Sequence, residues 1–465
     1  MSLSSALLTA KSSLAATSKQ TSVVSRNMAG ANDPDYSRRT ASLVSGPYGS
    51  LYVGISRSAD EALFNKFIQS NSTASSSSIL AGGLDRLSSL YSADNYSGSP
   101  AALVADLRDA LQTYAASPSN SALGDSVVSV AQSLANALNA GTKQVQSLRN
   151  DADREIADSV ANINDLLAKF EKVNQEIVGG TRANRDVSDY MDQRDAILKQ
   201  LSGEIGITTM MRGDNDMVIF AENGVTLFET TARKVSFEQS TVLAPGISGK
   251  AVLVDGVPLN HETFDQPYGT GRLSGLLQLR DQIAPQYQMQ LDEIARNLVS
   301  IFAEGDDGLL VWSDPAGPKN AGTIQVSSSY VTSEGGSPTK LRDGVNGQFN
   351  PGGAAGFSDR LRGLNEAFSE PMAFDPAAGL AANSSLIDYS ASSISWLEGK
   401  RQKANSEFSY NATVATQADA ALSNANGVDM DTEMALLLDL EHSYQASSRV
   451  LTTISAMLDD LLNAV

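Results

Sequence analysis

A heptad pattern in residues 437–465 constrains the fold more than any other feature of the sequence. Eight of nine positions spaced alternately three and four apart are apolar or aromatic: Leu437, Leu440, Tyr444, Ser447, Leu451, Ile454, Leu458, Leu461 and Val465. This spacing predicts a helix with one apolar stripe. Because each buried leucine contributes roughly 1.5–3 kcal/mol, the stripe must pack on another element and would promote aggregation if left in water.

A similar pattern near the N-terminus supplies the nearest partner for that stripe. Six of eight positions are apolar in the series Leu3, Leu7, Ala10, Leu14, Thr17, Thr21, Val24 and Met28. We expect this helix to end before Pro34, because a proline disfavours helical backbone in the residue before it. A neighbouring subunit is the alternative partner. The predicted assembly interface consists of Leu3, Leu7, Leu14, Val24, Met28, Leu437, Leu440, Tyr444, Leu451, Ile454, Leu458 and Leu461.

The chain between these two segments changes pattern several times. Helical periodicity covers 100–140, 142–178, 186–202, 273–303 and about 386–422, and Pro285 should kink or break the fourth of these helices. Short apolar runs separated by turn dipeptides predict strands over 204–267. The segment 305–380 is rich in Gly, Pro, Ser, Asn and Asp, which predicts an irregular insertion with strand character only at 324–331. The fold class is therefore α+β, multidomain and mainly α.

Composition excludes several classes of function. A net charge of −19 disfavours binding to nucleic acid and to anionic lipid, and no apolar run is long enough to span a bilayer. We expect no secretory signal peptide, because polar residues interrupt the leucines of residues 1–30. The chain has no cysteine, and its two histidines, His261 and His442, do not stand at the spacing of zinc ligands. No nucleophile-elbow pattern surrounds a serine, so the sequence gives no sign of a Ser/His/Asp triad. We therefore predict no catalytic, cofactor-binding or metal-binding residues.

Four shorter features have structural interpretations. We interpret Gly269–Gly275 as a turn into a helix, because its glycine spacing differs from that of a dinucleotide-binding loop. Arg212-Gly213-Asp214 is interpreted as part of a hairpin turn. The charges of Asp192–Asp195 and of Arg280-Asp281 are most simply solvated, although their recurrence hints at interdomain salt bridges. Asn174 lies in the apolar stripe of its helix and is either buried or exposed at the helix end.

Two segments carry a family resemblance. Ser25–Arg38 resembles the N-terminal motif shared by rod, hook and junction proteins of the bacterial flagellum, with Asp35 where that family usually has glycine. Asn426–Met434, continued by Ser443–Leu451, resembles the C-terminal motif of the same axial proteins. The motif residues singled out are Asn27, Pro34, Tyr36, Ser37, Arg38, Asn426, Val428, Glu433, Met434, Gln445 and Ala446.

Three further stretches resemble one family within this group. Met1–Leu7 running into Ser12–Ala16, Met191–Leu198, and Gly271–Asp281 are similar to the hook-associated protein 1 family. Another axial subunit, such as a hook or rod protein, would share the terminal motifs but lack the second and third stretches. A secreted coiled-coil adhesin or effector, and a wall hydrolase, are the alternatives from other classes.

The resemblance implies an elongated molecule with four parts. Residues 1–38 with 425–465 would form a terminal coiled-coil domain of an inner tube, disordered in the free subunit. Residues 39–203 with 268–304 and 380–424 would form a mainly helical bundle, 204–267 a small β domain, and 305–379 an irregular β and loop insertion.

The resemblance also implies a role and partners. The protein would be a secreted structural subunit of the extracellular flagellum, forming a ring that joins hook to filament and permits filament assembly. Its partners would be identical subunits, the flagellar hook protein below and the second junction protein, hook-associated protein 3, above. A dedicated chaperone and the flagellar type III export apparatus would export it without a cleaved signal peptide.

Overall fold

The computed structural model describes residues 3–45, 51–92, 95–259, 269–305 and 307–463. Its contacts divide the chain into two compact units, each assembled from segments distant in the sequence. Unit 1 comprises residues 1–74, 162–234 and 411–465, and unit 2 comprises residues 75–161 and 235–410. The fold is mainly helical with small antiparallel sheets, as the sequence predicts.

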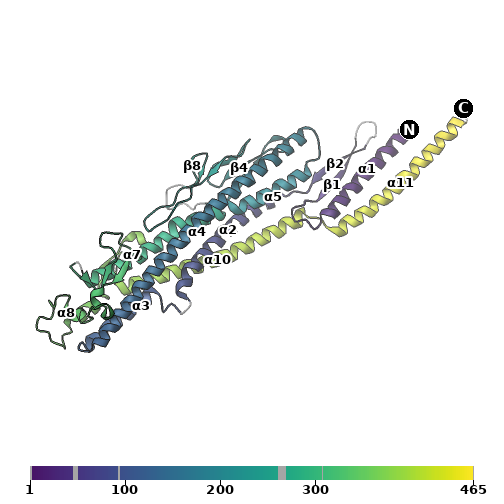
Figure 1. The fold of residues 1–465 in the computed structure, drawn as a ribbon. Helices are drawn as coiled ribbons and strands as arrows, with labels where there is room; N and C mark the ends of the chain where they lie inside the picture. The colour runs from purple at the N-terminus through teal and green to yellow at the C-terminus, as the bar shows by residue number, and fades with distance from the viewer. Residues whose placement is uncertain (1–2, 46–50, 93–94, 260–268, 306, 464–465) are drawn as a thin grey trace. The chain divides into compact units, whose positions relative to one another are not determined.

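Unit 1 pairs the two terminal helices and adds a β-hairpin and a small sheet. In chain order it contains α1 (Leu3–Gly30), β1 (Arg39–Ser45), β2 (Leu51–Arg57), the start of α2 (Glu61–Ser92), the end of α4 (Ser121–Arg182), α5 (Ser188–Glu204), β3 (Ile207–Met211), β4 (Met217–Ala221), β5 (Thr226–Phe228), the end of α10 (Leu386–Asn426) and α11 (Met430–Asn463). The helices α1 and α11 lie side by side (Figure 1). The hairpin β1–β2 also packs on α1, so α1 is covered on two faces.

Unit 2 is a helical assembly with short two- and three-stranded sheets. Besides its parts of α2, α4 and α10, it contains α3 (Pro100–Ala116), β6 (Val235–Ser236), β7 (Leu253–Val254), β8 (Val257–Pro258), α6 (Arg272–Gln278), the π-helix η3 (Leu279–Ile283), α7 (Ala284–Phe302), β9 (Ala303–Glu304), β10 (Asp307–Gly308), β11 (Leu310–Trp312), β12 (Ile324–Val326), α8 (Lys340–Asp343), α9 (Asp359–Ala367), β13 (Met372–Ala373) and β14 (Asn383–Ser384). Its core includes the fully buried side chains of Leu107, Leu111, Leu134, Leu138, Leu291, Leu298, Leu386 and Leu397.

In the described part of the segment predicted as one small β domain, 204–267, the strands form two separate sheets. Strands β3–β5 belong to unit 1, whereas β6–β8 belong to unit 2. The change of sequence pattern at residue 204 marks where strands begin, but it carries no information about the helices on which each sheet packs. The four-part division of the chain stays a prediction.

The break between the first two predicted helices lies at a different place in the structure. The predicted break near residue 141 is wrong, since α4 is continuous there. A side chain at Gly141 would place its Cβ 2.5 Å from the Tyr91 hydroxyl oxygen, so this glycine serves close packing of α2 on α4. The real break lies between Ala116 and Ser121, where Pro118 separates α3 from α4.

Pro285 is accommodated by the π-helical turn η3. The Ala284 N–H donates to the Leu279 carbonyl, five residues back instead of four. This widened turn places the proline at the start of α7, where its missing N–H removes no bond from the following helix.

The predicted irregular insertion contains more regular structure than its composition indicates. The strands β11 and β12 pair, as do β13 and β14, and the helices α8 and α9 fall between them. The apolar residues of α9, Leu361 and Leu364, are buried, so this short helix is stabilised by packing on α3 and α7.

Unit 2 buries a network of charges that the sequence interpretation treated as solvated. Arg280 has no exposed side-chain surface and its Nη1 lies 2.6 Å from Oδ1 of Asp153, which is 1% exposed. Arg280 also contacts Asp281 at 2.7 Å and the Lys250 carbonyl at 2.9 Å. The interpretation of Arg280-Asp281 as solvated is therefore wrong, because a guanidinium can be buried when carboxylates and carbonyls satisfy its donors.

Asp292 makes the stability of unit 2 dependent on pH. Its Oδ1 accepts hydrogen bonds from Ala321 N at 2.7 Å and Gln288 Nε2 at 2.8 Å, while burial raises its pKa to about 6. Because the folded state binds this proton more tightly than the unfolded state, stability falls as pH rises from the unfolded pKa near 3.8 to about 6. An Asp292→Asn variant, whose Oδ1 can still accept both bonds, has no such loss.

We expect Asp292→Asn to match the parent at pH 4 and to be more stable by about 2–3 kcal/mol at pH 7. Urea unfolding followed by tryptophan fluorescence measures this, because both tryptophans, Trp312 and Trp396, belong to unit 2. A stability difference that is the same at pH 4 and pH 7 would exclude Asp292 as its cause.

Candidate assembly interface

The terminal helices pair antiparallel in a defined register. The Ser13 and Ser447 hydroxyls lie 3.2 Å apart, and Asn27 Nδ2 donates to Glu433 Oε2 at 3.0 Å. Residue numbers on α1 therefore fall as those on α11 rise. This arrangement is the pairing that the two heptad patterns predict.

Most of the predicted interface residues are at least partly covered within the single chain. Val24, Leu440 and Ile454 are buried, while Leu7, Leu14, Met28, Leu437, Leu451 and Leu458 are half-buried. Tyr444 stays 46% exposed. The side chains of Leu3 and Leu461 lie outside the described residues. Whether these residues form the interface between subunits stays a prediction.

The heptad pattern missed a second buried face of α1. Ala16, Val23 and Asn27 are buried, and between them Gln20 Nε2 donates to the Ala41 carbonyl of β1 at 3.2 Å. These residues follow the spacing 16, 20, 23 and 27, which is itself helical. This spacing in the sequence could have revealed the second buried face of α1. The hairpin β1–β2 covers that face.

Asn27 is the centre of a cluster that joins α1, the hairpin and α11. Its Nδ2 donates to the Arg39 carbonyl at 2.8 Å and to Glu433, and its Oδ1 accepts from the Tyr36 hydroxyl at 2.9 Å and from Arg39 N at 3.0 Å. Both donors and both lone pairs of the amide are used. We call Asn27, Tyr36, Arg38, Arg39 and Glu433 the terminal clasp.

Glu433 and Arg38 complete the terminal clasp. The Glu433 side chain is fully buried on α11 and accepts from Arg38 Nε at 2.7 Å as well as from Asn27. Burial raises the pKa of Tyr36, so its hydroxyl stays protonated and donates to Asn27 at neutral pH. The N-terminal and C-terminal motif residues thus bind each other across more than 390 positions of sequence.

The joint between α10 and α11 is short and fixed by hydrogen bonds. Arg38 N donates to the Asn426 carbonyl at 2.7 Å, and Asp60 N donates to Asn426 Oδ1 at 3.1 Å. Asp429 caps α11, accepting from Asp431 N at 2.9 Å and Thr432 N at 3.1 Å. These backbone N–H groups lower the pKa of Asp429, Thr432 most strongly.

A group of ion pairs attaches the hairpin to α5. The buried Arg39 contacts Asp189 at 2.5 Å and Asp192 at 3.1 Å through Nη2, and Arg57 Nε contacts Asp192 at 2.7 Å. Arg57 also pairs with Asp195. Burial raises the pKa of Asp192, although Arg57 and Arg39 oppose that shift. The interpretation of these charges as solvated is wrong here too, and all of these pairs lie within unit 1.

Arg194, the remaining charge of this stretch, and Asn174 are also buried, whereas Asp214 is exposed. Arg194 is 3% exposed and donates through Nη1 to the Asn215 carbonyl at 2.7 Å. Asn174 is buried and donates to Asp216 Oδ1 at 2.7 Å, which decides between its two interpretations. Asp214 lies in the predicted hairpin turn, between β3 and β4, and pairs with Arg182 at 2.8 Å.

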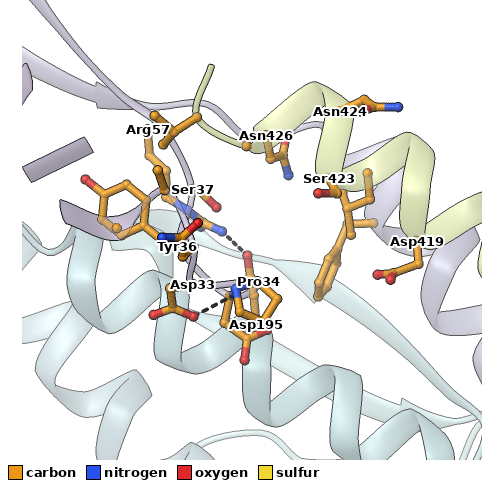
Figure 2. Close-up of a pocket in the computed structure, with 18 of the residues that line it drawn as sticks. Asp33, Pro34, Tyr36, Ser37, Arg57, Asp195, Asp419, Ser423, Asn424 and Asn426 are labelled. Carbon is orange, nitrogen blue, oxygen red and sulfur yellow. Dashed lines mark hydrogen bonds and ion pairs between the residues drawn. The ribbon is translucent and has the colours of Figure 1, made fainter. Parts of the chain in front are cut away.

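The loop after α1 and the end of α10 enclose a polar pocket of about 400 Å³ (Figure 2). Both motif segments line it, through Pro34, Tyr36, Ser37, Asn426 and Val428.

Asp35, the residue that departs from the family motif, lies in the same loop. It pairs with Lys199 at 2.9 Å, and its N–H donates to Asp33 Oδ1 at 3.0 Å. Asp35 has an ordinary negative φ, so this turn does not require the left-handed backbone expected for a glycine position.

Three motif residues do not join the terminal clasp or the pocket. Met434, Gln445 and Ala446 are exposed on α11. His442 is also exposed on α11, and His261 lies outside the described residues. Within the described ranges, no three carboxylate or histidine side chains are grouped as metal ligands. No helix there has the length and apolar character of a membrane span.

Comparison with known proteins identifies relatives of this chain. A family model described as the flagellar hook-associated protein FlgK helical domain matches residues 84–305, and one described as the flagellar basal body rod FlgEFG protein C-terminal region matches 410–464. Flagellar hook-associated protein 1 of Bacillus subtilis (strain 168) is 21% identical, covering 99% of this chain and 98% of the relative. The protein of the same name from Escherichia coli (strain K12) is 22% identical, covering 99% and 100%.

Among solved structures, the flagellar hook junction protein FlgK from Burkholderia pseudomallei is 23% identical, with a TM-score of 0.43, covering 53% of this chain and 46% of that one. The matches to curated relatives extend over nearly the whole chain, and the second family model covers the C-terminal motif found in the terminal clasp. Over nearly its whole length, the chain is similar to proteins named flagellar hook-associated protein 1.

Proposed function

We propose that this chain is a structural subunit of the extracellular bacterial flagellum, where a ring of identical copies joins hook to filament and permits filament assembly. The terminal clasp is the observation that supports this role most directly. It brings the two axial-protein motifs into one hydrogen-bonded cluster at the base of paired helices. A structural subunit catalyses no reaction, and we propose none for this chain.

The partners follow from this position. Hook protein would contact the ring below and the second junction protein, hook-associated protein 3, would contact it above. We propose export by the flagellar type III apparatus, with a dedicated chaperone and without a cleaved signal peptide. A pair of helices that becomes fully covered only on assembly suits this route, because the subunit must pass through the export channel unfolded.

Deleting the gene in its own bacterium tests the proposed function. We expect hooks of normal length without filaments, and flagellin shed into the medium, as seen by electron microscopy and by immunoblotting of the supernatant. A plasmid copy of the gene should restore filaments. Cells without hooks would assign the protein to the hook or rod instead, and normal motile filaments would exclude every flagellar role.

The free monomer should exchange the amide hydrogens of the terminal helices rapidly. On α11 the large apolar side chains that are buried, among those the structure describes, are Leu440 and Ile454, at 7% and 8% exposed. Two such residues contribute on the order of 3–6 kcal/mol, far less than the backbone entropy of ordering the two helices, which costs roughly 1–2 kcal/mol per residue. Hydrogen exchange with mass spectrometry should show little protection over 5–30 and 435–460 and strong protection over α7. Strong protection of the terminal helices in a verified monomer would contradict this.

A further inference from the structure

Three asparagines of this chain are each followed by glycine. The pairs are Asn223-Gly224, Asn346-Gly347 and Asn426-Gly427. An asparagine in this setting can lose ammonia, because the backbone nitrogen of the glycine can attack the side-chain carbonyl carbon. Glycine has no side chain to shield that nitrogen, and it adopts most backbone conformations. Both reacting groups must be free to approach each other, so the hydrogen bonds around each pair decide which pair reacts.

Asn346-Gly347 is the least constrained of the three pairs. It forms the last two positions of a turn that begins at Gly344, in unit 2. The Asn346 side chain is exposed, and its amide makes no hydrogen bond to any residue that the structure describes. The Gly347 N–H donates to the Gly344 carbonyl at 3.2 Å. That distance is at the long end of the range for N–H donors, about 2.7–3.2 Å, so little holds either reacting group in place.

Asn223-Gly224 provides a matched comparison, because it forms the last two positions of a similar turn. This turn begins at Ala221, between β4 and β5 in unit 1. The Gly224 N–H donates to the Ala221 carbonyl at 2.8 Å, and Asn223 Oδ1 accepts from the Val225 N–H at 3.1 Å. The asparagine must release Val225 before its carbonyl carbon can rotate towards the glycine nitrogen. Both reacting groups are therefore held by the hairpin.

Asn426-Gly427 is the most constrained pair. The Gly427 N–H donates to the Ser423 carbonyl at 2.7 Å, in the last turn of α10. Asn426 Oδ1 accepts from the Asp60 N–H at 3.1 Å, and the Asn426 carbonyl accepts from the Arg38 N–H at 2.7 Å. Reaction at this pair requires the joint between α10 and α11 to open.

We propose that Asn346 is a site of spontaneous deamidation in the folded chain, and that their hydrogen bonds protect Asn223 and Asn426. The Gly347 nitrogen loses its proton and bonds to Cγ of Asn346, and the bond from Cγ to Nδ2 breaks as ammonia leaves. Water then opens the five-membered succinimide ring at one of its two carbonyl carbons. Attack at Cγ gives aspartate. Attack at the main-chain carbonyl carbon gives isoaspartate, in which the main chain runs through the side-chain carbons.

Both products disturb the contacts of Glu304. Its Oε2 accepts from the Val345 N–H at 3.0 Å and from Gln348 Nε2 at 2.7 Å, so the residues on either side of the reacting pair bind one carboxylate. Aspartate at position 346 adds a second negative charge close to that carboxylate. Isoaspartate adds one carbon to the main chain between Val345 and Gln348, so the two bonds cannot both keep their lengths. We expect the turn to separate from Glu304 in the product.

Ageing the purified full-length chain at mildly alkaline pH tests the proposal. Mass spectrometry of its peptides measures the conversion of amide to acid at each pair, and chromatography separates isoaspartate from aspartate. We expect Asn346 to react at least about tenfold faster than Asn223 and Asn426, because each hydrogen bond that must break first slows the reaction. The variant Asn346→Gln should lose the product at this position and keep the other two rates, since its longer side chain closes a ring more slowly.

Urea separates the effect of the fold from that of the local sequence. The unfolded chain lacks the native hydrogen bonds, so we expect the three pairs to react at rates within about threefold of one another. Equal rates in the folded chain, or the same ranking in urea, would overturn the proposal. A faster reaction at Asn426 than at Asn346 would also overturn it, because the joint would then open more readily than the turn.

Hydrogen exchange tests the expected loss of the Glu304 contacts. Residues 345–349 should exchange their amide hydrogens faster in the aged chain than in the Asn346→Gln variant aged in the same way, because Val345 loses its acceptor. Equal exchange in the two chains would show that the turn stays on Glu304, and would overturn this consequence of the reaction.

Discussion

Replacing Arg280 with methionine is expected to lower the free energy of unfolding of unit 2 by about 3–5 kcal/mol. The change removes the buried partner of Asp153, which is itself 1% exposed and has Arg280 2.6 Å away. A carboxylate left unpaired in that position keeps the cost of desolvation without the attraction that offsets it. Urea unfolding at pH 7, followed by the fluorescence of Trp312 and Trp396, measures the loss.

The matched control for that prediction is Arg86→Met. Arg86 also pairs with an aspartate, Asp151, at 2.6 Å, but its side chain is 46% exposed. An exposed pair contributes about 0–1 kcal/mol. The double variant Arg280→Met/Asp153→Asn should recover part of the loss, because it removes the buried charge. If Arg280→Met costs no more than Arg86→Met, burial of the pair does not determine its contribution.

Replacing Asn27 with alanine is expected to abolish filament assembly. Asn27 makes four hydrogen bonds that join α1 to the hairpin and to α11, and the change leaves the Arg39 N–H and carbonyl without partners. Unsatisfied buried groups of this kind cost about 1–3 kcal/mol each. The terminal helices would then separate from the rest of unit 1, and we expect at least a tenfold loss of cells that bear filaments.

Electron microscopy of a deletion strain carrying the variant gene measures that effect. Asn32→Ala is the control, since Asn32 is exposed and lies five residues further along the chain. The amount of exported variant, measured by immunoblot of the medium, separates failed assembly from failed export. Normal filament numbers with Asn27→Ala would show that the terminal clasp is dispensable.

The sequence predicts the paired terminal helices because their pattern is local and repeated. An alternation of three and four residues places side chains on one face of a helix wherever the helix lies. The same argument accounts for α4, α5, α7 and α10, whose apolar periodicity extends over several turns. It does not give the antiparallel register, which is fixed by Asn27 and Glu433 and depends on pairs more than 400 positions apart.

The charged residues show why the site was less predictable than the fold. Arg39 and Asp192 lie 153 positions apart, and neither has a sequence neighbour that indicates the other. A charge on a helix is usually solvated, so Asp192, Arg194 and Arg280 were assigned to the surface, whereas the structure buries all three. The resemblance of the stretches that contain them to one family was the only indication of a special role. The close approach of Gly141 to Tyr91 of α2 is likewise a contact between distant positions that the sequence pattern does not indicate.

The loop that follows α1 also limits how this sequence can diverge. A Cβ at Gly30 would lie 2.6 Å from the Tyr36 ring, so any other residue there would displace the ring whose hydroxyl donates to Asn27. Tyr36 in turn has no freedom to move while Asn27 uses all of its hydrogen-bonding capacity. Gly30, Tyr36 and Asn27 therefore depend on one another, and a substitution at any one of them is expected to disturb the hydrogen bond between Tyr36 and Asn27.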